Sequence, residues 1–218
     1  MQNRIEIDIA GAQVLLLAEK ALWWPAEQCL ILSDLHFGKS SHFRKAGIPV
    51  PGAVFSDTAE RLIRLFQWYK PKCVVFLGDL FHSAYNREWD HLENILSQFP
   101  GIEFVLVQGN HDVLDHKRYA AVGFQLFTVL KMAPFAFCHA PEDAGNDAFY
   151  WCGHLHPGIR LRGKGKQSIT LPCFFLSQHM GILPAFGSFT GLALQKPKAG
   201  ERVFALADGE VFECQGRS

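Results

Sequence analysis

The chain has 218 residues, 49% of them hydrophobic, and its 21 basic residues balance 21 acidic ones. This length and apolar content suit a single domain over residues 1–218 with a sizeable core, and the zero net charge gives no global argument for a nucleic-acid or membrane partner. No apolar run of about 18 residues occurs and the N-terminus lacks a signal-peptide core, so we expect a cytoplasmic protein with no membrane partner.

The first half of the chain predicts short apolar strands that alternate with amphipathic helices. In chain order these are a hairpin over residues 4–20, a strand at 29–32, a basic loop at 37–52, a helix from Ser56 to Pro71, a strand at 73–77, a helix from near Asn86 to Phe99, and a strand at 104–107. Asp57 and Glu60 have the spacing of a capping box at the start of the first helix. Strands joined by helices through short connections predict right-handed crossovers and a parallel sheet.

The second half predicts further strands without long helices. They follow at 135–138, 149–152, 168–176 and 188–194, with a basic loop at 160–166 and a final hairpin at 203–214 that turns at Asp208-Gly209. A parallel α/β half followed by an antiparallel β half predicts two sheets packed face to face with helices outside.

The six cysteines contain no CxxC pair. Four of them, Cys29, Cys73, Cys138 and Cys152, lie inside predicted buried strands. This placement favours small, reduced, hydrophobic side chains over a disulfide framework or a thiolate zinc site.

Polar side chains follow five of the apolar strands, at the point where each strand ends. They are Asp34, His36, Asp79, Asn110, His139, His154 and His156. Carboxylate, amide and imidazole ligands together suit first-row metal ions, and seven ligands exceed what one ion takes while leaving room for water and substrate. We therefore expect two ions, with Asp79 on the most buried strand as the carboxylate that bridges them.

A single histidine beside a core strand is more often a hydrogen-bonded core residue than a ligand. The combination reverses this interpretation, because burying seven such groups without a metal would cost several kcal/mol per unpaired charge. Spacing supports convergence, since residues i and i+2 of an extended segment point to the same side. Asp34 can thus join His36 on one ion, while His154 and His156 can share an ion or reach one ion each.

These blocks resemble, in order, the five signature motifs of the calcineurin-like metallophosphoesterases. The motifs are Asp34-x-His36, Gly78-Asp79, Gly109-Asn110-His111-Asp112, His139 and Gly153-His154-x-His156, and they span about residues 28–157. Residues 33–39, 42–51 and 183–191 further resemble the ligase-associated DNA damage response endonuclease branch. The resemblance implies a four-layer α-β-β-α sandwich of two packed mixed sheets flanked by helices.

The resemblance also implies a role for each residue of the motifs. Asp34, His36 and His156 would hold one ion, Asn110, His139 and His154 the other, and Asp79 would bridge them. His111 would face the scissile phosphate as general acid or charge stabiliser, oriented by Asp112. His82 would lie near the site in an unassigned role. The two ions would be divalent, with Mn²⁺ expected first and Fe or Zn accepted by the same ligands.

The metal site predicts a phosphoesterase without naming its substrate. Basic residues on two loops, Arg44, Lys45, Arg160 and Arg162 together with Lys164 and Lys166, could line a groove for a polynucleotide backbone, although such loops are often only solvated turns. The main hypothesis is a phosphodiesterase that acts on DNA in repair, with a DNA repair ligase or helicase as partner. One alternative is hydrolysis of a small nucleotide or another small phosphoester, and another is a non-catalytic interaction scaffold of the same fold. The sequence does not predict an oligomeric state.

Overall fold

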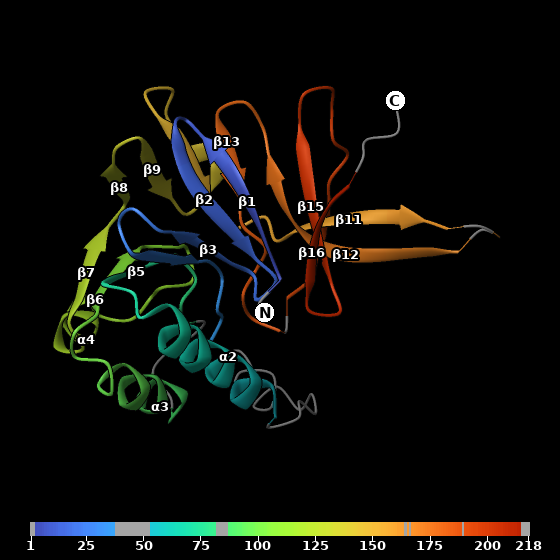
Figure 1. The fold of residues 1–218 in the computed structure, drawn as a ribbon. Helices are drawn as coiled ribbons and strands as arrows, with labels where there is room; N and C mark the ends of the chain where they lie inside the picture. The colour runs from blue at the N-terminus through green and yellow to red at the C-terminus, as the bar shows by residue number, and fades with distance from the viewer. Residues whose placement is uncertain are drawn as a thin grey trace.

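A computed structural model of the chain describes residues 3–37, 53–81, 87–163, 165, 167–188 and 190–214. Its first sheet has seven strands that lie side by side in chain order (Figure 1). They are β1 (Arg4–Ile9), β2 (Ala12–Leu17), β3 (Ala21–Trp24), β4 (Cys29–Leu32), β5 (Cys73–Leu77), β6 (Glu103–Val107) and β7 (Phe124–Phe127). The strands from β1 to β4 pair antiparallel, whereas those from β4 to β7 pair in parallel. The predicted parallel sheet is thus confirmed.

The second sheet has nine strands and mixed pairing. Its path runs β14-β11-β12-β13-β10-β9-β8, and β15 joins it through β12 and carries β16. The strands are β8 (Val129–Met132), β9 (Phe135–Cys138), β10 (Phe149–Cys152), β11 (Pro157–Arg162), β12 (Ser168–Leu176), β13 (Met180–Ile182), β14 (Ala193–Leu194), β15 (Arg202–Ala207) and β16 (Glu210–Cys214). β10 is parallel to both β9 and β13, so β9 and β10 end at the same edge.

The helices α2 (Ala53–Tyr69), α3 (Arg87–Leu96) and α4 (His116–Ala121) lie on the outer face of the first sheet (Figure 1). A short 3₁₀ turn, η1 (Pro141–Asp143), follows β9. The helices bury residues such as Leu62, Phe66, Trp89 and Leu92 against Phe76 and its neighbours on the sheet. Apolar residues at this helical spacing explain why these segments form amphipathic helices.

Alternation along the central strands builds two separate cores. On β5, Val74 and Phe76 belong to the helix-side cluster, while Val75 and Leu77 belong to the cluster between the two sheets. Because both faces are covered, the strand is apolar throughout, as expected for a parallel strand. Each such side chain contributes about 1.5–3 kcal/mol through burial. This confirms the predicted α/β sandwich of two packed mixed sheets.

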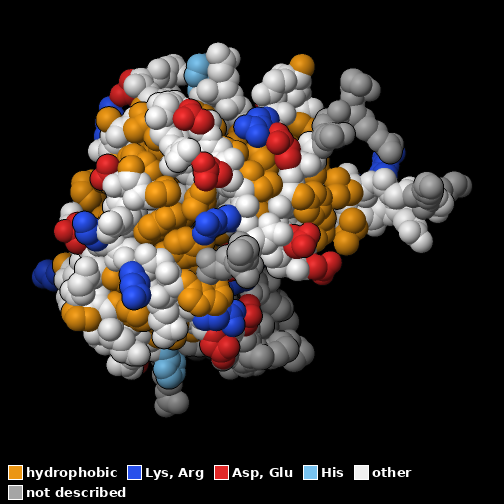
Figure 2. Space-filling view, in the orientation of Figure 1, with side chains coloured by type: hydrophobic (Ala, Val, Ile, Leu, Met, Phe, Trp, Pro, Cys, Tyr) orange, Lys and Arg blue, Asp and Glu red, His pale blue; other side chains and the backbone are white. Residues whose placement is uncertain are grey.

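The far face of the second sheet carries two smaller apolar clusters, and none of the described α-helices contributes to them. Apolar side chains reach the surface where β11, β12 and the β15–β16 hairpin meet (Figure 2), and Ile169 is 56% exposed. Elsewhere on the face shown in Figure 2, basic and acidic side chains are interspersed. The described helices therefore cover one sheet of the sandwich.

Several predicted boundaries are wrong. The second long helix ends at Leu96 rather than at Phe99. The first long helix begins at Ala53 rather than Ser56, so Asp57 lies inside α2 and does not cap it. The basic segment that starts at Arg160 is a strand up to Arg162, because β11 pairs with β12 in a hairpin. Of the strand predicted at 188–194, only Ala193–Leu194 is a strand, and much of the rest is irregular.

None of the helices in the described ranges is long and apolar enough to cross a bilayer. The final hairpin is confirmed at 202–214. Asp208 and Gly209 both adopt positive φ angles, as the two central residues of a type I′ hairpin turn require. The predicted basic loop at 37–52 lies outside the described residues, apart from Phe37.

Candidate metal centre

Strand ends from both sheets meet at one edge of the sandwich. β4, β5 and β6 are parallel neighbours, so the residues after them, including Asp34, Asp79 and Asn110, emerge side by side. The ladder continues past the strands, since the Asp34 N–H donates to Gly78 O at 3.2 Å and the His36 N–H to Asp79 O at 2.9 Å. In open α/β sheets, this carboxyl edge is where ligands bind.

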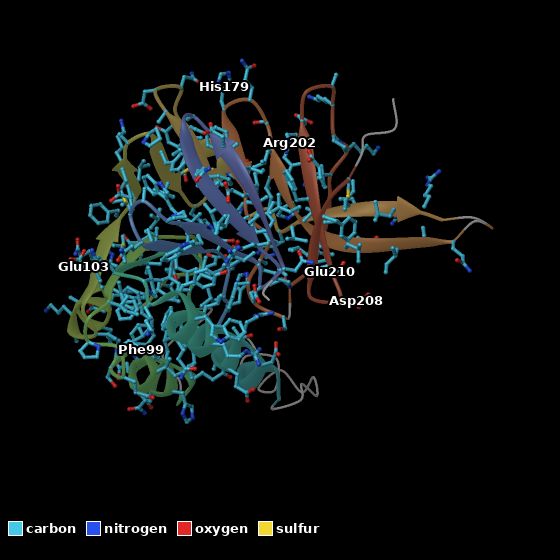
Figure 3. The ribbon with its side chains drawn as sticks, viewed as in Figure 1. Phe99, Glu103, His179, Arg202, Asp208 and Glu210 are labelled. Atoms are coloured by element: carbon cyan, nitrogen blue, oxygen red, sulfur yellow. The ribbon has the colours of Figure 1, made fainter. Side chains whose placement is uncertain are left out.

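The opposite edge of the first sheet also has a hollow. A cavity of about 650 Å³ lies beside Phe99 and Glu103 (labelled in Figure 3), where β6 begins. Its described lining holds two carboxylates, from Glu93 and Glu103, but no imidazole. Carboxylate and imidazole side chains that could bind metal together therefore gather at the carboxyl edge of the sheet, and not beside this cavity.

One group of ligand types consists of Asp34, His36 and His156. One donor atom from each lies within 4.8 Å of the others. His36 Nε2 is 3.2 Å from His156 Nε2, which is 3.3 Å from Asp34 Oδ1. The structure thus brings together the three residues that the resemblance assigned to the first ion.

A second group consists of Asp79, His139 and His154, with their donor atoms again within 4.8 Å. His139 Nε2 is 3.1 Å from His154 Nδ1 and 3.4 Å from Asp79 Oδ1. Asn110 joins this group, because its Oδ1 lies 3.1 Å from His139 Nε2. These are the residues assigned to the second ion, together with the expected bridge.

Asp79 faces both groups with different oxygen atoms. Its Oδ1 is 3.4 Å from His139 Nε2, while its Oδ2 is 3.9 Å from His36 Nε2. Oδ1 also accepts the backbone N–H of His111 at 3.0 Å. The carboxylate therefore has the position that a bridging ligand needs.

The donor spacing fits metal ions. Two donors about 2.1 Å from one ion lie about 3.0 Å apart at a right angle and about 3.4 Å apart at a tetrahedral angle. Five donor pairs within the two groups are 3.1 Å to 3.4 Å apart and match this range, and the donor atoms of each group of three lie within 4.8 Å of one another. The donor set, with carboxylate, amide and imidazole but no thiolate, suits Mn, Fe or Zn.

The backbone is strained at most of these residues. Asp34, His36, Asp79, His154 and His156 all have positive φ angles, between +47° and +66°. Such angles are uncommon for residues with a Cβ and persist only where the surroundings impose them, typically at functional sites. The strained turns, which follow β4, β5 and β10, aim side chains from three segments at one point.

Glycines make the close approach possible. A Cβ on Gly109 would lie 2.4 Å from Asp79 Oδ1, and one on Gly153 would lie 2.7 Å from Asp34 Oδ2. Gly78 has φ +73°, and a Cβ there would lie 2.2 Å from His139 Nδ1. Each glycine thus lets a ligand side chain pack directly against the backbone.

The site has a buried floor and an accessible rim. Asp34, Asp79, His36 and His139 are buried, whereas Asn110 is exposed and His111, His154 and His156 are partly exposed. Ligand positions on the floor are shielded from water, while the rim leaves access for a substrate. This arrangement is that of a catalytic rather than a closed structural metal site.

Electrostatics favour the ionised form of Asp34 at the floor of the site. Burial alone would raise the pKa of Asp34, but the contact with His156 and the charges of His156, His139 and His36 outweigh it and lower the pKa. The backbone N–H of His154 also donates to Asp34 Oδ2 at 3.0 Å. A buried anion beside imidazole rings is a setting that cations stabilise.

His111 lies at the rim, with its ring centroid 6.0 Å from that of His36. Asp112 accepts the N–H groups of Gly109 at 2.9 Å and Phe81 at 3.2 Å, and it lies 3.5 Å from the Tyr119 hydroxyl. Burial raises the pKa of Asp112 to about 6, against the backbone donors that lower it. Asp112 therefore holds the loop that carries His111, and a direct orientation of the His111 ring stays a prediction.

Sequence patterns did not indicate Tyr119, which is buried on α4 beside Asp112. The short helix α4 has too few residues to show a period. The one sequence signal for this helix was Asp115, a residue type that favours the N-cap position. Its side chain accepts the N–H of Lys117 at 2.9 Å.

The proposed substrate residues are only partly placed. Arg160 and Arg162 are exposed and lie on the same face of β11, opposite Thr170 and Ser168 of β12. β11 begins directly after His156, so the two arginines lie roughly 13 Å and 20 Å along the strand from that ligand. Lys164 and Lys166, like His82, Arg44 and Lys45, fall outside the described residues.

Comparisons with known proteins concern the fold and the family of the chain. The crystal structure of Pseudomonas putida nuclease MPE matches with a TM-score of 0.82 and 28% identity, covering 97% of this chain and 100% of that one. The E. coli phosphoesterase YfcE matches with a TM-score of 0.39 and 14% identity over 83% of this chain and 88% of that one. A search of curated proteins finds no match. The family model for calcineurin-like phosphoesterases matches residues 28–168, and the chain therefore belongs to that family.

Proposed function

We propose that this chain is a two-metal phosphodiesterase that cleaves DNA. The observation that carries the proposal is the pair of ligand groups, Asp34–His36–His156 and Asp79–His139–His154, which meet at Asp79. Membership in the phosphoesterase family supports the reaction class. The likeness to a nuclease over almost the whole chain supports a nucleic-acid substrate.

In this proposal the ligands divide as the resemblance implies. Asp34, His36 and His156 hold one ion, Asn110, His139 and His154 hold the other, and Asp79 reaches both. Bound divalent cations would supply a water of lowered pKa and would neutralise charge on the phosphate. We propose Mn²⁺ as the ion, with Fe or Zn accepted by the same donors.

His111 acts on the leaving group. It is partly exposed at the rim, near His36 but outside both ligand groups, where a phosphodiester bound at the site could reach it. As an imidazolium it donates a proton to the departing alkoxide oxygen, which is worth about 10²- to 10⁴-fold in rate. Asp112 supports this role by fixing the Gly109 end of the loop.

A phosphodiester of DNA brings further phosphates that basic side chains can neutralise. Arg160 and Arg162 lie on a strand that leads away from the site, where they could contact the backbone beyond the scissile bond. His82, Arg44 and Lys45 remain proposed substrate contacts, based on the sequence. Such contacts make binding dependent on salt.

The test compares two substrates. Cleavage of single-stranded DNA in the presence of Mn²⁺ should fall steeply between 50 and 200 mM salt, roughly as expected for several phosphate contacts. Hydrolysis of bis-p-nitrophenyl phosphate should change little over the same range. Hydrolysis of the small ester without any cleavage of DNA would overturn the DNA assignment and favour a small-phosphoester substrate.

A pair of variants locates the DNA contacts. The double variant R160S/R162S should lower the slope of log binding constant against log salt for single-stranded DNA by about 2, one for each lost contact. The matched control is K70S/K72S, because both exposed lysines lie just before β5, at the edge away from the site. An equal change in both double variants would show that the arginines have no special role.

We also propose that the protein works in the cytoplasm on DNA during repair, together with a DNA repair ligase or helicase. The support is the resemblance of residues 33–39, 42–51 and 183–191 to the ligase-associated endonuclease branch. A ligase or helicase should co-purify with the chain from its own cells. Loss of that protein on addition of nuclease-resistant competitor DNA would show that DNA mediates the contact, whereas its retention would show a direct contact.

A further inference from the structure

Residues 183–188 link the second sheet to the turn that carries Asp34. The segment starts just after β13, where the N–H of Leu183 donates to Cys152 O at 2.8 Å. It then crosses to the first sheet, where the Phe186 N–H donates to Ser33 O at 2.8 Å and the Gly187 N–H to Asp34 O at 3.0 Å. The segment is thus hydrogen-bonded to backbone groups that lie at or near predicted metal ligands of both sheets.

These bonds satisfy carbonyl groups at the end of β4. Ser33 and Asp34 are fully buried, and Asp34 has φ +52°, so a buried carbonyl there needs a partner from elsewhere in the chain. Ser33 adds a third bond, from its hydroxyl to Pro184 O at 3.3 Å. The segment therefore holds the strained Asp34 turn in place.

The contact is too close for a larger residue at Gly187. A Cβ there would lie 2.5 Å from Leu35 O and 3.1 Å from Asp34 O. The backbone of the segment consequently lies directly on the backbone that precedes His36. A displacement of the segment would be transmitted to this turn.

Helix α2 fixes the segment from the other side. The Arg61 guanidinium donates to Phe186 O and lies 4.3 Å from the centroid of the Phe186 ring. Phe186 is fully buried in the helix-side core, and the Ser188 hydroxyl donates to Asp57 Oδ2 at 2.8 Å. Arg61 thus uses both its donor group and its planar face on one residue.

We propose that Arg61 is a positioning residue for the ion held by Asp34, His36 and His156, acting through residues 183–188. This inference rests on the proposed metal function. The chain of contacts runs from Arg61 to Phe186, from Phe186 and Gly187 to the Ser33 and Asp34 carbonyls, and from there to the Asp34 carboxylate. Outer contacts of this kind orient metal ligands, and their loss costs about 10- to 100-fold in metal affinity.

The variants separate positioning from bulk stability. Arg61→Met keeps an unbranched apolar stem but removes every side-chain donor and the planar group over Phe186, while Arg61→Lys keeps a charge without the planar fork. Arg64→Met is the matched control, because Arg64 is exposed on the same helix. Ser188→Ala removes a single hydroxyl and serves if the Arg61 variants do not fold.

The experiment titrates Mn²⁺ into metal-free protein and follows free Mn²⁺ by electron paramagnetic resonance, with thermal unfolding of the same samples by circular dichroism. Arg61→Met should weaken one of two binding events about 10-fold and leave the other unchanged. Arg61→Lys should give a smaller shift, Ser188→Ala a shift of a few fold in the same event, and Arg64→Met none. Saturating Mn²⁺ should restore turnover of bis-p-nitrophenyl phosphate.

Three results would overturn the inference. If wild type and Arg61→Met bind both ions alike, Arg61 does not position the site, although the proposed function stands. If both binding events weaken equally in step with a lower unfolding temperature, the residue acts only on overall stability. If wild type binds no Mn²⁺, Fe²⁺ or Zn²⁺, the proposed function fails, and this inference fails with it.

Discussion

Gly78→Ala tests whether His139 must remain in its present position for metal binding and catalysis. Gly78 follows β5 directly and precedes Asp79, with φ +73°. A Cβ there would lie 2.2 Å from His139 Nδ1 and 2.6 Å from His139 Cγ. The histidine ring would therefore have to move by about 1 Å to reach an ordinary contact distance.

That movement would break the contacts that orient His139. Its Nδ1 lies 2.8 Å from Leu77 O, and its Nε2 lies 3.4 Å from Asp79 Oδ1. Misplacement by about 1 Å can cost about 10²-fold in rate, so we expect a loss of that order. For stability, a left-handed backbone costs an alanine about 1–2 kcal/mol, and the crowding adds about 1–3 kcal/mol.

Gly123→Ala is the matched control. Gly123 has φ +90° in the same sheet's α4–β7 turn, yet a Cβ there would meet nothing within 4 Å. It should lose about 1–2 kcal/mol of stability from its backbone and keep full activity. The assays are urea unfolding, bound manganese, and hydrolysis of bis-p-nitrophenyl phosphate. Full activity and full metal content in folded Gly78→Ala would refute the assigned role of His139.

Two further predictions concern other parts of the molecule. His111→Ala should lower cleavage of an unactivated phosphodiester by about 10²- to 10⁴-fold with bound metal unchanged, and loss of metal in parallel would show that His111 is a ligand. Burial and, to a smaller extent, the charge of Arg61 lower the pKa of Lys20 to about 8, while Asp57 opposes this shift. Below that pH the folded protein holds Lys20 in its charged form, which the surroundings disfavour. Lys20→Met should therefore unfold at a higher temperature than wild type at pH 7, with a difference that shrinks as the pH rises from 8 to 10. A pH-independent difference in unfolding temperature would contradict this.

The sequence could predict which polar side chains gather at the candidate metal centre because its signals are local. Each of five buried strands is an apolar run that ends in a polar residue, as at Leu77-Gly78-Asp79 and Cys138-His139. Parallel pairing then brings the ends of neighbouring strands to one edge without any further information. Metal-ligand chemistry supplied the remaining selection, and the structure places all seven predicted ligands in two adjoining groups.

The remaining features depend on contacts between distant residues. Arg61 and Phe186 are 125 residues apart, and Ser33 and Pro184 are 151 apart, so no periodicity links them. Tyr119 reaches Asp112 from a helix of six residues, which is too short to give a helical pattern. The start of α2 at Ala53 was missed because the Asp57 and Glu60 spacing of a capping box also occurs inside helices.

The central claim is that side chains from both sheets hold two ions with Asp79 between them. Manganese bound per chain, measured by mass spectrometry after dialysis of metal-loaded wild type and Asp79→Asn, tests it most directly. We expect about two ions per wild-type chain and fewer than about one in Asp79→Asn, since loss of a bridging carboxylate weakens both sites. Equal metal content in the two proteins, or no bound metal in an active wild type, would contradict the account.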